Sequence, residues 1–251
     1  MSLLSTDAGI LLLPGRALLG RGGRALDERR GEGWDGALSS LEAVLKQAGR
    51  VGGVRVGLSH HFASMHVFEP PAVRLPRDEM QGWLRERLSQ DFGTEAESWR
   101  LAWQDVPPGR HVPVAALPVD RFEALHAQLH AVGASLKQLA PWFLTAWTRH
   151  RTALASANTW LALAEPGRLA LARVEHGRPV HVGMSRLDAG QASAVTAQVA
   201  AAVARQALRL GVAVEGEVGL LAPDLPVEGA VPGSSLRFRL LDGAGWGGVL
   251  P

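Results

Sequence analysis

The feature that most constrains the fold is a layout of strands and turns that occurs twice along the chain. Near the start, the apolar runs 9–13 and 16–19 are separated by Pro14-Gly15, a pair typical of a turn between two strands. The layout begins again at Thr159, with three predicted strands and a helix: 160–164, 169–174, 180–187 and 189–210. The repetition predicts an internal duplication.

Between the two repeats, strands and helices alternate. Apolar residues at helical spacing predict helices over 37–48, 77–92, a stretch beginning near Asp120, and 142–151. Alternating or β-branched runs predict strands over 54–58, 61–69, 99–106, 111–117 and 135–139. This order indicates a layered α/β core.

Composition excludes several classes of protein. The 251 residues include no cysteine, which rules out a disulfide framework, a thiolate nucleophile and an iron–sulfur centre and favours a reducing, cytoplasmic location. The start of the chain lacks the features of a secretory signal. Basic and acidic residues nearly balance, at 26 against 24, so we expect no nucleic-acid partner. Arg205 and Arg209 would each cost about 2.5 kcal/mol or more in a bilayer, so no membrane insertion is expected for 189–210.

Part of the chain resembles a known family. The residues that carry the resemblance run through Val54–Phe62, Arg77–Phe92, His111–Asp120, Trp160–Arg168 and Leu169–Arg173. In this order they are similar to the actin-like assembly proteins of bacterial type IV pili and to the cytosolic domain of the type II secretion L protein. The similarity covers somewhat over half of the chain.

The resemblance implies a two-lobed actin-like fold in which each lobe is an RNase H-like subdomain. The first lobe would comprise 1–153, with a small β/α insertion at about 60–106 between the Val54–Ser59 and His111–Leu117 strands. The second, shortened lobe would comprise 154–251. It also implies a partner, an inner-membrane assembly protein that contributes a short cytosolic peptide to the cleft or to the insertion.

An active actin-like ATPase needs a carboxylate and free backbone N–H groups in the first turn of each lobe, to hold hydrated Mg²⁺ and phosphate oxygens. The first turn, Leu13-Pro14-Gly15-Arg16, has no carboxylate, and Pro14 lacks an N–H. The second turn, Glu165-Pro166-Gly167-Arg168, keeps an acid but again contains a proline. We therefore expect weak or absent binding of Mg-ATP, with Arg16 and Arg168 as solvated residues at the turn tips.

Other candidate sites are weaker. His126 and His130 have the i, i+4 spacing of a metal pair, but residue 127 is Ala rather than the Glu of a metalloprotease motif. No Gly-x-Ser-x-Gly elbow marks a hydrolase. The predicted insertion contains Trp83, Trp99 and Trp103, and an exposed Trp there would suit a protein interface.

The sequence thus favours a non-catalytic, actin-like cytoplasmic scaffold of a type IV pilus or type II secretion-like machine, recruited to the inner membrane by a partner. One alternative is an actin-like ATPase or sugar-kinase-like enzyme that retains nucleotide turnover through Glu165. Another is a binding module that works without an envelope machine.

Overall fold

The computed structural model describes residues 8–21, 24–107, 109–155, 159–188, 192–225, 227, 231 and 234–241. The chain forms two compact units that divide at Trp142 and Phe143. The predicted lobe boundary, between 153 and 154, lies further along the chain. Helix α4 (Trp142–His150), expected at the end of the first lobe, begins at the division instead.

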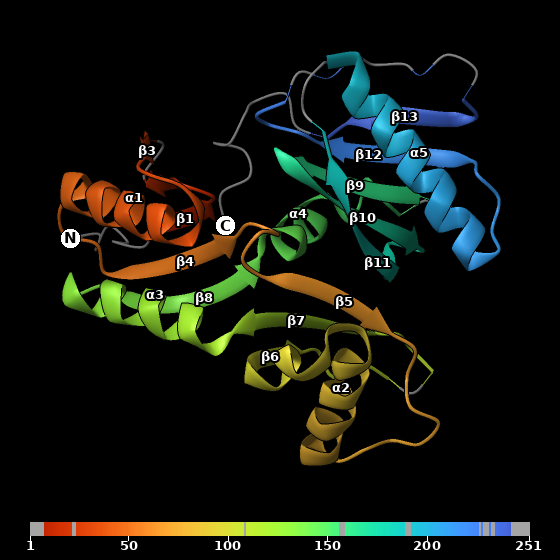
Figure 1. The fold of residues 1–251 in the computed structure, drawn as a ribbon, viewed down its shortest axis with the longest axis horizontal. Helices are drawn as coiled ribbons and strands as arrows, with labels where there is room; N and C mark the ends of the chain where they lie inside the picture. The colour runs from red at the N-terminus through yellow and green to blue at the C-terminus, as the bar shows by residue number, and fades with distance from the viewer. Residues whose placement is uncertain are drawn as a thin grey trace. The chain divides into compact units, whose positions relative to one another are not determined.

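The first unit contains a five-stranded sheet in the order β3-β2-β1-β4-β8 (Figure 1). Its strands are β1 (Ala8–Leu13), β2 (Arg16–Arg21), β3 (Arg24–Arg29), β4 (Gly53–Leu58) and β8 (Ser135–Pro141). The first three form an antiparallel meander, and β4 and β8 run parallel to β1. Pro14 and Gly15 form the tight turn of the first hairpin, which pairs Leu13 with Arg16.

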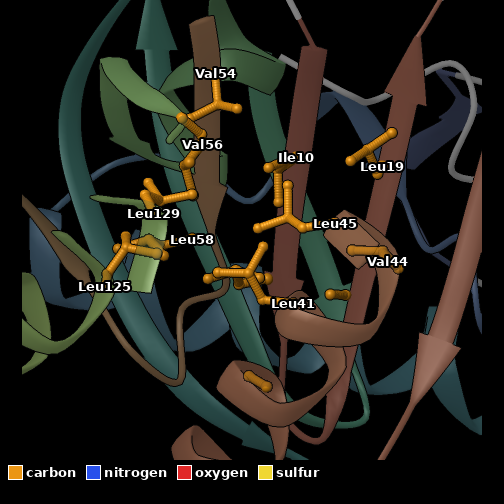
Figure 2. Close-up of a cluster of buried hydrophobic side chains, with 14 of the residues drawn as sticks. Ile10, Leu19, Leu41, Val44, Leu45, Val54, Val56, Leu58, Leu125 and Leu129 are labelled. Carbon is orange, nitrogen blue, oxygen red and sulfur yellow. The ribbon is translucent and has the colours of Figure 1, made fainter. Parts of the chain in front are cut away.

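Two helices cover this sheet and form the main core of the unit. Figure 2 shows Leu41, Val44 and Leu45 of α1 (Gly33–Ala48) beside Ile10 and Leu19, and Leu125 and Leu129 of α3 (Val119–Ala131) beside Val54, Val56 and Leu58. The strand residues are spaced by two and the helix residues by three or four, as one buried face of each element requires. Burial of each such side chain contributes about 1.5–3 kcal/mol.

A separate three-stranded antiparallel sheet in the order β5-β7-β6 belongs to the same unit. Its strands and helices are β5 (Ser64–Phe68), α2 (Arg77–Phe92), the 3₁₀ helix η1 (Gly93–Ser98), β6 (Trp99–Trp103) and β7 (Val112–Pro118). The predicted insertion at 60–106 was therefore too short. The strand expected to return to the large sheet, β7, is the centre of the small one, because Val112 and Val114 pack on Leu84 of α2.

The second unit repeats the topology of the first sheet. Its strands are β9 (Thr159–Glu165), β10 (Gly167–Glu175), β11 (Arg178–Leu187), β12 (Gly216–Leu221) and β13 (Leu236–Leu240), in the order β11-β10-β9-β12-β13. Again the first three form a meander, and the last two are parallel to the first strand. The two sheets are separate and their strands are connected in the same order, which confirms the predicted duplication of the layout.

Helix α5 (Ala192–Leu210) packs on the second sheet and occupies the place in the topology that α1 has in the first. Val195, Val199 and Val203 are fully buried on its inner side. Residues 189–191 of the predicted helix lie outside the described residues. None of the helices in the described ranges is long and apolar enough to cross a membrane.

Candidate functional site

The turn between β1 and β2 is closely packed against the beginning of α1. The backbone N–H of Gly15 donates a hydrogen bond to the carbonyl of Gly33 (2.9 Å), and the Gly15 carbonyl accepts from the N–H of Arg30 and the hydroxyl of Ser40. Gly15 has a φ of +66°, and a Cβ at this position would collide with the backbone of Gly31. Both polar backbone groups of the turn glycine are therefore already hydrogen-bonded within the protein.

Arg16 differs from the expectation of a solvated residue at the turn tip. It is only 7% exposed, and its Nε and Nη2 donate to the two carboxylate oxygens of Asp27 on β3, at 2.7 and 2.6 Å. This hydrogen bonding lowers the pKa of Asp27 below its usual value. The two side chains meet because β2 and β3 pair in the meander, which places Arg16 and Asp27 only two residue pairs apart along the strands.

The second turn keeps its acidic residue inside the unit. Glu165 is 2% exposed at the end of β9, while Pro166 and Gly167 are exposed and Arg168 is half-buried. Gly167 has a φ of +82°, a conformation that glycine adopts without strain. The buried carboxylate is the feature of this turn that an ATPase pocket would need.

The three tryptophans of the insertion pack between α2 and the small sheet. Trp99 is 9% exposed, packs on Leu88 and lies 5.0 Å from Phe92 between ring centroids. Trp83 and Trp103 are half-buried; Arg77 stacks 4.9 Å from the Trp103 ring. Trp99 is thus a core residue rather than a surface anchor, whereas Trp83 and Trp103 stay candidates for a partner surface.

The structure also contains an apolar groove that the sequence did not reveal. Its volume is about 270 Å³, and it lies in the first unit between β8 and the face of the small sheet opposite α2. Ala102 of β6 and Ala115 of β7, which pair across the sheet, line it together with Phe122 of α3 and Leu136 and Leu139 of β8. Small side chains at the paired positions leave the space that forms the groove.

One wall of the groove is a strand with an open edge. β8 is the last strand in the order of its sheet, and β4 is its only partner among the described strands. Such an edge presents backbone N–H and C=O groups that a further extended segment can pair with. The groove therefore combines an apolar pocket with a hydrogen-bonding edge, as sites for extended peptides do.

His126 and His130 are the candidate metal ligands that the sequence offers. Among the described residues, no group of three or more His, Asp or Glu side chains is placed to hold a metal ion. His126 and His130 are both exposed on α3, and the ring of His126 stacks on Phe122 at 5.9 Å.

Comparisons with known proteins agree on the fold. The cytoplasmic domain of EpsL, an inner-membrane component of the type II secretion system of Vibrio cholerae, is similar over 93% of this chain and 88% of its own, with a TM-score of 0.56 and 14% identity. In a PilM-PilN type IV pilus biogenesis complex, the matched chain gives a TM-score of 0.57 at 14% identity, over 84% of this chain and 67% of that one.

A Bacteroides thetaiotaomicron protein of unknown function, described as having an actin-like ATPase fold, gives a TM-score of 0.56 at 12% identity, over 89% of this chain and 87% of its own. The fold is actin-like. No protein-family model and no curated protein sequence matches the chain.

Proposed function

We propose that this protein is a non-catalytic, actin-like scaffold at the cytoplasmic face of a type IV pilus or type II secretion-like assembly machine. The groove beside β8 receives a short cytosolic segment of an inner-membrane partner. The observation that carries this proposal is the apolar groove with an open strand edge, in a fold similar to that of EpsL and PilM. Membrane association then comes from the partner.

The first turn supports the absence of efficient catalysis. Phosphoryl transfer depends on metal and backbone positioning. In this turn Pro14 has no N–H, the N–H of Gly15 is bonded to Gly33, and the side chain of Arg16 is engaged by Asp27. A phosphate group would have to displace these hydrogen bonds, which favours a scaffold over an ATPase.

Cell fractionation tests the scaffold proposal. The protein expressed alone should stay in the supernatant and should move to the inner membrane when the neighbouring genes are expressed with it. Ala102→Trp fills the groove from an exposed position on β6 and should abolish the shift, whereas Ala127→Trp, on the exposed side of α3, should not. Membrane association without the neighbouring genes, or unchanged association of the Ala102→Trp variant, would contradict the proposal.

A second candidate function, an actin-like ATPase, is favoured by the buried carboxylate of Glu165 at the second turn. It predicts micromolar affinity for Mg-ATP and a turnover that Glu165→Gln abolishes. The scaffold proposal predicts no affinity tighter than about 1 mM, equivalent to about 4 kcal/mol. Titration calorimetry with Mg-ATP separates the two.

A further inference from the structure

The charges of the groove point to the chemistry of its occupant. Arg100 of β6 and Lys137 of β8 line it from two different sheets, and every other described residue that lines it is neutral. The guanidinium of Arg100 lies 4.2 Å from the centroid of the Phe122 ring. In the described part of the chain, neither cation forms an ion pair. The groove thus carries two positive charges without an ion-pair partner among the described residues.

Most of the groove lining is apolar, so charge attraction alone does not describe the ligand that the groove would bind. Ala102, Ala115, Leu136 and Leu139 line the same groove with apolar surface, and burial of that surface needs an apolar ligand group. A membrane surface would be attracted by a larger group of basic residues, typically four to eight. Two cations that flank an apolar pocket at a strand edge fit a peptide better.

We propose that the partner segment is an acidic, extended peptide that pairs with the open edge of β8. Alternate side chains of such a segment point to one face, so aliphatic residues can lie over Ala102 and Ala115 while Asp or Glu residues lie near Arg100 and Lys137. This inference rests on the proposed function of the groove and adds its selectivity. Opposite charge at the rim of an interface mainly selects the partner and speeds association.

The test uses a phage-displayed library of random twelve-residue peptides, selected on the full-length protein. Clones that Ala102→Trp no longer binds are groove-specific, and we expect them to be enriched in Asp and Glu relative to the unselected library. Synthetic copies of these peptides should bind Arg100→Glu/Lys137→Glu about tenfold more weakly or worse, because two attractions become repulsions. Arg110→Glu, exposed and outside the groove, is the control for a charge reversal elsewhere on the surface, and it should leave the affinity unchanged.

The outcomes separate this inference from the proposed function. Groove-specific clones without acidic enrichment, or with equal affinity for the wild type and the double charge reversal, would overturn the acidic selectivity while leaving the groove as a peptide site. A selection that yields no clone sensitive to Ala102→Trp would overturn both. Acidic clones whose affinity also falls as salt is raised support the inference, since exposed ion pairs are screened.

Discussion

Replacement of Gly36 by Ala should destabilise the protein, although the same change stabilises most helices. In an ordinary helix, Gly→Ala contributes about 1 kcal/mol of stability. Gly36 lies in the first turn of α1, where a Cβ would be 2.5 Å from the carbonyl oxygen of Arg30, 2.7 Å from the carbonyl carbon of Gly31 and 3.0 Å from the Cα of Gly15. All three atoms are backbone, so no side-chain rotation relieves the contacts.

We expect overpacking to cost about 2–3 kcal/mol, which outweighs the propensity gain of about 1 kcal/mol and leaves a net loss of about 1–2 kcal/mol. With a urea m-value of about 2 kcal/mol/M, the midpoint of unfolding should fall by about 0.5–1 M. Gly82→Ala is the matched control: it lies in α2 with no heavy atom within 4 Å of its Cβ position, and it should raise stability by about 0.5–1 kcal/mol. Equal midpoints for the two variants would refute the argument that α1 locks the β1–β2 turn.

Three further predictions concern the insertion and the turns. Trp99→Ala should cost about 3–5 kcal/mol in the free energy of unfolding, seen as a lowered Tm, because the ring is buried against Leu88; an unchanged Tm would make Trp99 a surface residue. Burial lowers the pKa of His66 from 6.5 to about 4, so the free energy of unfolding should fall by up to about 3 kcal/mol as the pH falls from 6.5 to 4. His66→Phe should remove that loss. Equal pH profiles of unfolding for the wild type and the variant would argue against it. Asp27→Asn should remove stability at neutral pH and have less effect at pH values below the lowered pKa of Asp27, where the wild-type carboxyl is protonated; a pH-independent difference in the unfolding midpoint would contradict this.

The elements best predicted from the sequence carry their own start and stop signals. The predicted helix 77–92 coincides with α2, since it follows Pro76 and ends before Gly93, whose φ is +64°. The hairpin turn at Pro14-Gly15 was equally clear. Strand β3 was missed because its sequence, Arg24–Arg29, is rich in charged residues and lies at a sheet edge. Such a strand forms because it pairs with its neighbouring strand, and its own sequence shows no alternation of apolar and polar residues.

The site was harder to predict than the fold because it depends on long-range contacts. Gly15 is hydrogen-bonded to Gly33, and Arg16 forms an ion pair with Asp27. No sequence motif marks either pair of residues. The groove is lined by β6 and β8, two strands of different sheets that are far apart in the sequence, and its paired alanines look like ordinary strand residues in the sequence. Sequence reasoning therefore placed the partner surface in the cleft or on the tryptophans of the insertion. Of these tryptophans, Trp99 is buried, so only Trp83 and Trp103 stay candidates.

A photo-crosslinking amino acid placed at Ala102, on the exposed edge strand that lines the groove, tests the central claim most directly. In cells that express the neighbouring genes, the account predicts a light-dependent crosslink from position 102 to the cytosolic segment of an inner-membrane protein, identified by mass spectrometry. The same amino acid at Ala127, exposed on α3 and outside the groove, should give no such product. Equal crosslinking from both positions, or a crosslink from neither while the protein still fractionates with the membrane, would contradict the groove as the docking site.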